Sequence, residues 1–291
     1  MTPVCIAPTG DRCGEGVVWS ADEAAVYWTD INRFLIHRLD TASDAVHSWM
    51  FEEPVVALAL TTRRGTMLVA LGSRLLLWQP ESNGRHEHGF ALPGWPRVRL
   101  NDGRPDPLGN FWVGSMRNNV LPDGEPGETS PGDGKLFRIA PDGAVTVWRE
   151  DLGISNTLCW SPDHRRFYFG DTLENEVRAY DYDRVSGAIA NERPFLRATG
   201  AGFPDGSAID AEGWLWNCRW GGGCLLRAAP DGRAVERIAM PVTNVTTAAF
   251  GGPDLRTLYV STAHHTGERL SGSLFRLDVD VPGLPENRFK A

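Results

Sequence analysis

The feature that most constrains the fold of this chain is a strand-turn-strand motif that occurs six times. The motifs follow one another at intervals of about 45 residues, which is the length of a propeller blade. A β-sandwich also has many strands, but it does not repeat one phrase at so even a period. The repeat predicts an all-β fold, a six-bladed β-propeller with a central channel, and we expect residues 1–291 to form a single domain. The six strand cores are Val26–Trp28, Met67–Val69, Phe111–Val113, Phe167–Phe169, Trp214–Trp216 and Leu258–Val260. The second segments are Leu35–Leu39, Leu75–Trp78, Lys135–Ile139, Val177–Tyr180, Leu225–Ala228 and Ser273–Leu277.

Composition agrees with many short strands and excludes several classes of protein. The chain has 32 Gly and 20 Pro, and almost no segment shows a helical period over a helix length. The net charge is −8 and only two lysines occur, which argues against a nucleic-acid surface. No apolar run reaches the length of a membrane span, and the start lacks the pattern of a secretory signal. We therefore expect a cytoplasmic protein without nucleic-acid or membrane partners.

Cysteine use and the closed fold bear on metals and on assembly. The five cysteines form no C-x-x-C pair, so neither a disulfide framework nor a zinc knuckle is indicated, and we expect mostly buried thiols. A ring of blades hides its sheet edges, so we expect a monomer or a weak oligomer.

Four stretches carry polar groups in the loops expected to lead into blades, and each precedes an aromatic strand. They are Gly14–Gly16, Arg99–Gly103, Ile154–Thr157 and Phe203–Gly206. Loops at one end of a propeller channel converge, so their side chains can share one site. The last stretch predicts a tight turn that presents Asp205, because Pro204 restricts its own φ and Gly206 permits a positive φ. The alternative is a plain turn, since the same chemistry recurs at 141–143 and 230–232.

The donor types at these four stretches suit a metal ion. Oxygen ligands from Glu, Asn and Asp favour a hard cation such as Ca²⁺, Mg²⁺ or Mn²⁺, although zinc or iron could also bind. Two carboxylates in a partly dehydrated channel repel each other unless a cation lies between them. The adjacent pair His264–His265 could bind a metal in principle, but neighbours on a strand point to opposite faces, so a loop pair without that role is favoured.

A Gly- and Pro-rich acidic insertion lies between the third and fourth repeats, at residues 118–134. Such a segment cannot be core. It is either a solvated loop or a flap over the channel mouth.

The same motifs resemble the regucalcin/gluconolactonase family, and the resemblance runs in order along nearly the whole chain. The phrases that carry it are residues 14–19, 26–31, 99–103 with 114–116, 154–158, and 204–206 with 210–213. The resemblance implies a six-bladed propeller that hydrolyses sugar lactones with one divalent cation (Ca²⁺, Zn²⁺, Mg²⁺, Mn²⁺ or Fe²⁺) in the channel. Thr157 is a departure, because many members have Gly after the ligand Asn.

The resemblance also implies roles for individual residues. Glu15, Asn156 and Asp205 are similar to the metal ligands, and Asp205 is similar to the general base. Arg99 and Asn101 are similar to the substrate-binding pair. A further polar or acidic substrate group comes from the loop after the third-blade strand, for which we choose Glu128, with Glu125 as the alternative.

These observations predict metal-dependent ring opening of an aldonolactone to the sugar acid. A phrase at 220–223 with 244–246 and 250–254 resembles bacterial aldonolactonases, which favours a pentonolactone or hexonolactone. No Gly-x-Ser-x-Gly elbow supports covalent catalysis. Two alternatives stay open: a metal-dependent esterase or phosphotriesterase, and a calcium-binding propeller without catalysis. Candidate pocket walls are Trp95, Met116, Phe203 and Trp220.

Overall fold

The structure is a computed structural model that describes residues 1–197, 199–233 and 235–291. Throughout these residues the chain forms β-strands and turns, and none of them is helical. No helix in the described part is therefore long and apolar enough to cross a membrane.

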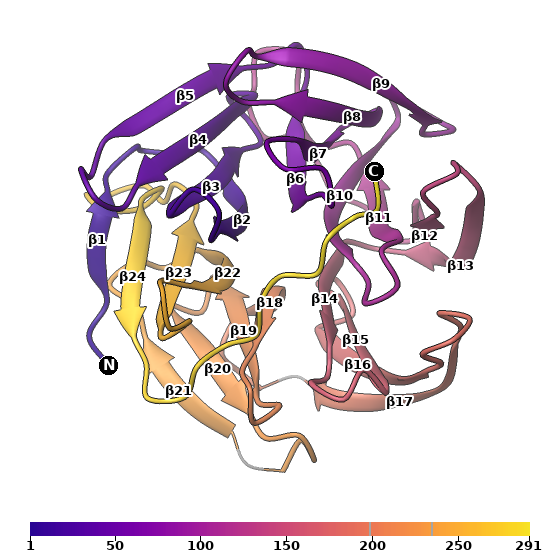
Figure 1. Cartoon of the computed structure of the whole chain (residues 1–291). Helices are drawn as coiled ribbons and strands as arrows, with labels where there is room; N and C mark the ends of the chain where they lie inside the picture. The colour runs from indigo at the N-terminus through magenta and orange to yellow at the C-terminus, as the bar shows by residue number, and fades with distance from the viewer. Residues whose placement is uncertain (198, 234) are drawn as a thin grey trace.

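The strands form six four-stranded antiparallel sheets arranged around a channel (Figure 1), which confirms the predicted propeller. Blade 1 contains β2 (Gly14–Ser20), β3 (Ala25–Asp30), β4 (Leu35–Asp40) and β5 (Val46–Met50). Blade 2 contains β6 (Val55–Leu60), β7 (Met67–Leu71), β8 (Arg74–Gln79) and β9 (Gly84–Ala91). Blade 3 contains β10 (Val98–Pro105), β11 (Phe111–Arg117), β12 (Gly134–Ile139) and β13 (Val145–Leu152).

The second half of the ring repeats this order. Blade 4 contains β14 (Ser155–Trp160), β15 (Arg166–Asp171), β16 (Glu176–Tyr182) and β17 (Ile189–Arg197). Blade 5 contains β18 (Phe203–Ile209), β19 (Leu215–Trp220), β20 (Cys224–Ala228) and β21 (Val235–Ala239). Blade 6 contains β22 (Val245–Gly251), β23 (Thr257–Thr262), β24 (Leu274–Asp278) and the N-terminal strand β1 (Val4–Ala7).

The six strand cores predicted from the repeat are the second strands of the blades, and the six following segments are the third strands. For the four polar stretches that precede these cores the sequence predicts loops, whereas the structure has them on the innermost strands β2, β10, β14 and β18; the innermost strands of the other two blades are β6 and β22. The prediction of loops is wrong for a physical reason. These strands are buried on both faces, so polar channel residues and glycines interrupt the alternation by which a half-exposed strand is recognised.

Repeated turns fix the second strands of two blades. Asp106 accepts the indole N–H of Trp112 at 2.9 Å, and Asp210 accepts that of Trp216 at 3.0 Å. Each carboxylate also accepts backbone N–H groups of its own turn. The aspartate therefore stabilises both the turn and the buried tryptophan that follows it, which explains why the phrase recurs.

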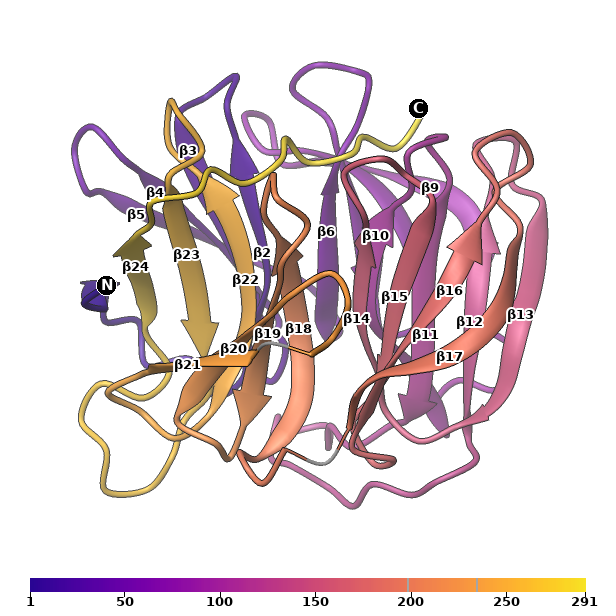
Figure 2. The ribbon, with the colours of Figure 1, turned by 90° about the horizontal axis from the view of Figure 1, so that it is seen from below.

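The ring is closed by the two ends of the chain, and the tail covers one end of the channel. Strand β1 pairs with β24, so blade 6 draws on both ends of the sequence. Figure 2 shows the segment after β24 crossing one end of the channel, and the β11–β12 connection crossing the opposite end. The tail is held by Phe289, whose N–H donates to Leu60 O at 2.9 Å. The two ends of the channel are thus crossed by different segments, the C-terminal tail at one end and the β11–β12 connection at the other (Figure 2).

Candidate functional site

Each polar stretch singled out in the sequence lies on an innermost strand at a β-bulge. The register shifts between Glu15 and Val18 in β2, Leu100 and Gly103 in β10, Asn156 and Leu158 in β14, and Pro204 and Ser207 in β18. A bulge leaves a residue out of the ladder and redirects its side chain, and bulges are common beside active sites. Here four bulges near the same end of four strands turn their polar side chains into the channel.

The structure corrects the prediction of a tight turn at Asp205. Residues 203–206 belong to strand β18, and Gly206 does not adopt a positive φ. Glycine is required there by close packing, because an added Cβ would lie 2.0 Å from Oγ1 of Thr247 in blade 6. Asp205 is thus held by a strand packed between two neighbouring blades, a firmer support than an exposed turn gives.

Five of the predicted site residues line one cavity of about 310 Å³ at this end of the channel. They are Glu15, Arg99, Asn101, Asn156 and Asp205. Three predicted wall residues, Met116, Phe203 and Trp220, also line it, whereas Trp95 does not. The remaining lining residues are Cys13, Ile31, Asn119, Thr129, Ile154, Thr172 and Leu173. The chemistry-bearing residues of blades 1, 3, 4 and 5 therefore meet in one place.

The floor of the cavity holds two buried carboxylates close together. Burial raises the pKa of Glu15 well above its usual value of 4.5, and the negative charge of Asp205 raises it further. Burial also raises the pKa of Asp205, with the charge of Asp102 as the next cause. Both shifts have the same origin, since a carboxylate loses hydration and meets other negative charges. A cation among these oxygens would relieve that repulsion.

The amide of Asn156 is arranged to leave its oxygen available. Its Nδ2 donates to Thr172 Oγ1 at 2.8 Å, and that hydroxyl donates to Pro204 O at 2.8 Å. Within the described residues, the Oδ1 atom receives one contact, a long one of 3.4 Å from Asn101 Nδ2. Two carboxylates and this amide oxygen form a hard donor set of the kind that binds divalent cations.

A neighbouring thiol, that of Cys13, is protonated in the cation-free site. Cys13 lines the cavity, and burial, followed by the charge of Glu15, raises the pKa of its thiol. The thiol is therefore neutral near neutral pH. In the described ranges no group of three His, Cys, Asp or Glu side chains is placed to hold an ion. Beside Glu15 and Asp205, the amide oxygen of Asn156 is the third oxygen donor that the cavity offers.

Thr157 tightens the junction between blades 4 and 5. It has a φ of 53°, a left-handed conformation that is strained for a β-branched residue. Its Oγ1 donates to Asp205 O at 2.5 Å and lies 2.9 Å from Ser207 Oγ. The residue that departs from the family pattern therefore places its hydroxyl on the backbone of Asp205.

Arg99 organises two amides of the cavity wall. Its Nη1 donates to Asn101 Oδ1 at 2.7 Å, and its Nη2 and Nε donate to Asn119 Oδ1 at 2.8 and 3.1 Å. Burial lowers the pKa of Arg99 to about 10, which leaves the guanidinium charged near neutral pH. Because Arg99 fixes the Oδ1 of Asn119, it also fixes the direction of the Asn119 amide N–H groups.

Sequence reasoning missed Asn119 and placed the third substrate-binding residue further along the insertion. Glu128 is exposed and does not line the cavity, and Glu125 forms an ion pair with Arg12 at 3.0 Å. The insertion contributes Asn119 and Thr129 instead. The signal that could have identified Asn119 is its position, two residues beyond β11, the strand that carries Met116.

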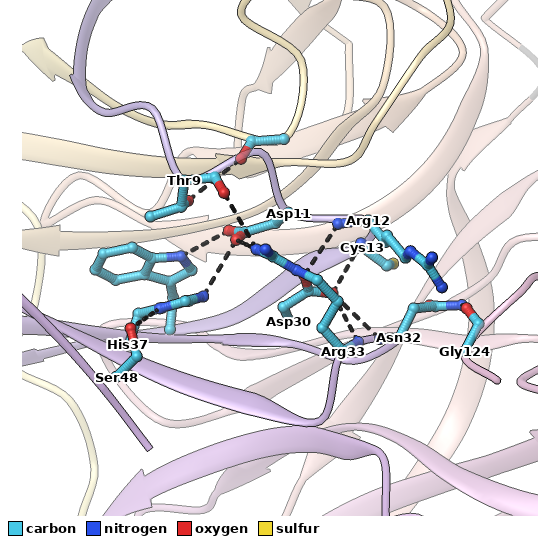
Figure 3. A network of polar contacts seen from close by, with 12 residues as sticks. Thr9, Asp11, Arg12, Cys13, Asp30, Asn32, Arg33, His37, Ser48 and Gly124 are labelled. Carbon is cyan, nitrogen blue, oxygen red and sulfur yellow. Dashed lines mark hydrogen bonds and ion pairs between the residues drawn. The ribbon is translucent and has the colours of Figure 1, made fainter. Parts of the chain in front are cut away.

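The insertion reaches across the channel mouth from blade 3 to blade 1. Figure 3 shows Asn32 extending to Gly124, whose carbonyl accepts from Asn32 Nδ2 at 2.8 Å. Arg12 Nη1 donates to Asp123 O at 3.1 Å. On the blade 1 side, buried Asp30 accepts the backbone N–H groups of Arg12 and Cys13 at 3.0 and 3.2 Å. These contacts hold the insertion against blade 1, and two residues of the insertion, Asn119 and Thr129, line the cavity.

The raised pKa values predict an unusual pH dependence for the cation-free protein. Below the unfolded values of 4.5 and 3.8, Glu15 and Asp205 are protonated in both states and contribute nothing. As pH rises toward the raised folded pKa values, only the unfolded state ionises, so we expect the free energy of unfolding to decrease. Denaturant titrations in a chelating buffer from pH 4 to pH 8 test this. The Glu15→Gln variant should lose less stability over this range, and an identical slope would contradict the assignment.

Comparisons with a family model, with known sequences and with solved structures all point to the same family. Residues 13–264 match the family described as SMP-30/Gluconolactonase/LRE-like region. The chain is 35% identical to pentonolactonase XacC of Haloferax volcanii over 300 residues, which covers 99% of this chain and 98% of the relative. It is 33% identical to 6-deoxy-6-sulfogluconolactonase of Pseudomonas putida, covering 98% and 97%. Among solved structures, regucalcin of Agrobacterium tumefaciens, described as a calcium-binding protein, matches with a TM-score of 0.90 at 29% identity, covering 99% and 97%.

Proposed function

This chain belongs to the SMP-30/gluconolactonase/LRE-like family, and from this premise we propose that it hydrolyses a sugar lactone to the aldonic acid with one divalent cation. Two relatives whose names describe lactonases support the reaction class. The observation that carries the proposal is the buried pair Glu15 and Asp205 beside Asn156, on the floor of one cavity. Such a pair is unfavourable by itself and suits a site built around a cation.

The size and lining of the cavity fit a single sugar ring. A volume of about 310 Å³ lies at the lower end of the range for small-molecule pockets. Polar groups from four blades converge on the floor, while Leu173, Phe203 and Trp220, together with Thr129, line the more exposed part of the cavity. A lactone of five or six ring atoms can therefore lie with its carbonyl toward Asp205.

Glu15, Asn156 and Asp205 would hold the cation through their oxygens. When bound, the cation supplies Lewis-acid polarisation of the lactone carbonyl and stabilises negative charge on its oxygen. Ca²⁺, Mg²⁺ and Mn²⁺ suit such donors, and Zn²⁺ or Fe²⁺ stay within the proposal.

Asp205 would act as the general base of the hydrolysis. Its carboxylate accepts a proton from water while the water oxygen adds to the carbonyl carbon. The bond between that carbon and the ring oxygen then breaks, and the proton passes from Asp205 to the departing ring oxygen. The product is the open-chain hydroxy acid, which contains all the atoms of the lactone and of the water.

Three residues of blade 3 would orient the substrate. Asn101 and Asn119 line the cavity and offer amide groups to the sugar hydroxyls, and Arg99 holds both amides in place. Orientation of this kind raises the rate because the reacting atoms start close together and aligned.

A panel of lactones tests the proposal. Pentono- and hexonolactones of both ring sizes are offered to the purified protein with each divalent cation, and acid release is followed with a pH indicator. We expect turnover of at least one sugar lactone that requires an added cation. Turnover of phosphotriesters or simple esters alone would favour the esterase alternative, and tight Ca²⁺ binding without turnover would favour a non-catalytic propeller.

A further inference from the structure

The cavity changes character from its floor to its mouth. Glu15 and Asp205 on the floor are 7% and 6% exposed, whereas Leu173, Phe203 and Trp220 are 40%, 47% and 37% exposed. All five residues line the same cavity. Three large apolar side chains therefore remain accessible to solvent around the opening of a pocket whose floor is acidic.

The apolar rim, formed by Leu173, Phe203 and Trp220, is built from two adjacent blades. Phe203 and Trp220 are direct cross-strand partners at the ends of β18 and β19, and Leu173 follows the second strand of blade 4. Directly opposed side chains on antiparallel strands lie within contact reach of the same ligand face. An exposed apolar cluster around a pocket indicates a surface that becomes covered when a ligand binds.

The rim lacks a cationic partner for a charged substituent. Among the described residues that line the cavity, Arg99 has the single cationic side chain. Its guanidinium already donates to Leu100 O, Asn101 and Asn119. The nearby Arg219 is buried and donates to Asn217 Oδ1 at 2.8 Å, Ala201 O at 2.9 Å and Gly202 O at 2.7 Å. A phosphate or sulfonate at the mouth would thus replace part of its hydration by apolar contacts, with no free cation among the described lining residues to compensate.

We propose that the site selects uncharged lactones and that Phe203, Trp220 and Leu173 pack against the C–H face of the ring or side chain farthest from the carbonyl. This inference rests on the proposed function, because the position of the carbonyl at the floor sets which end of the substrate reaches the rim. The aromatic pair supplies affinity through burial of apolar surface, and the absence of a free cation among the described lining residues rejects anionic sugars.

Alanine variants with a matched control test the role of the rim. Phe203→Ala and Trp220→Ala are each expected to raise KM for a neutral lactone roughly 3- to 10-fold, with kcat within about 2-fold. Trp95→Ala is the control, because Trp95 is also 37% exposed but lies outside the cavity, and it should leave KM unchanged. Unchanged KM in the Phe203→Ala, Trp220→Ala double variant would overturn the proposal.

A charged substrate tests the selectivity in both directions. Gluconolactone and 6-phosphogluconolactone share a ring and differ in one phosphate, and their spontaneous hydrolysis is subtracted. The natural protein is expected to show kcat/KM at least about 100-fold lower for the phosphorylated compound. Leu173→Lys places a cation at the mouth. It should reduce the ratio of kcat/KM for gluconolactone to kcat/KM for 6-phosphogluconolactone about 10-fold or more. Equal use of both compounds by the natural protein would contradict the inference.

Binding of an inert analogue separates this inference from the reaction itself. Calorimetric titration of 1,5-anhydroglucitol, which has the ring but no carbonyl, measures affinity without turnover. Weaker binding by Trp220→Ala than by Trp95→Ala would support the role of the rim, whether or not any lactone is hydrolysed. If such weaker binding were found and no lactone were hydrolysed, the proposed function would be refuted and the rim would not. Hydrolysis with unchanged affinity in Trp220→Ala would refute the rim alone.

Discussion

Asp205→Asn is expected to lower the rate of lactone hydrolysis by about 10³-fold or more while the fold stays intact. A positioned general base contributes roughly 10²- to 10⁴-fold, and the same change removes one charged oxygen from the cation site. The amide has nearly the same shape, and it removes one of two neighbouring buried negative charges. The melting temperature of the cation-free protein should therefore be unchanged or higher. Initial rates with saturating cation, together with thermal melts, measure both effects.

A second Pro-Asp-Gly sequence in the same chain, at residues 141–143, provides the control for this variant. Asp142 also stands between Pro and Gly, but it is exposed and its carboxylate accepts the N–H of Ala144 at 3.0 Å, far from the cavity. Asp142→Asn should retain full activity. If Asp205→Asn kept more than about a tenth of the natural rate, another group would have to be the base.

Removal of divalent cations is expected to abolish turnover, and Glu15→Gln is expected to prevent its recovery at ordinary cation concentrations. A bound cation would relieve the mutual repulsion of the two buried carboxylates, and the neutral amide in Glu15→Gln would weaken the attraction for the cation. A cation at 100 times its Kd stabilises the folded state by about 2.7 kcal/mol. We expect the natural protein to show the corresponding rise in melting temperature and Glu15→Gln to show little.

A second buried glutamate provides the matched control for the cation experiment. Glu53 is buried like Glu15, but it pairs with Arg74 and accepts the N–H of Ser73 at 2.9 Å in blade 2. For Glu53→Gln the measured quantity is the rise in melting temperature when the cation is added. A lower melting temperature of this variant before addition therefore does not affect the comparison. Full activity after exhaustive chelation, or an equal thermal shift in Glu15→Gln, would remove the cation from the mechanism.

Prediction from the sequence is strongest where one local phrase is repeated. Strand cores such as Val26–Trp28 and Trp214–Trp216 carry a signal that needs no distant contact, and six copies predict a ring of six blades. The repeat also places Glu15, Asn156 and Asp205 at equivalent points of their blades. Because a propeller superimposes equivalent points around one axis, these residues could be expected to meet.

Prediction failed where the decisive contact joins segments that are well separated along the chain. Gly206 looked like a turn residue, but it is needed because Thr247 of blade 6 packs against it. Asn119 looked like loop sequence, but its amide is bound by Arg99 from the neighbouring strand. Glu128 had the favoured chemistry and yet lies exposed outside the cavity. Local residue preferences carry no information about which surface the next blade presents.

The sequence by itself determined the number of blades, the family and the oxygen donors on the channel wall, because each depends on residues close together in the chain. Tertiary structure decided that bulges in the innermost strands turn those donors into one cavity. It also decided that Phe203 and Trp220 stand at the mouth, where the described lining residues offer no free cation. Packing of blade against blade sets both results, since a side chain gains its direction and its partners only when the ring closes.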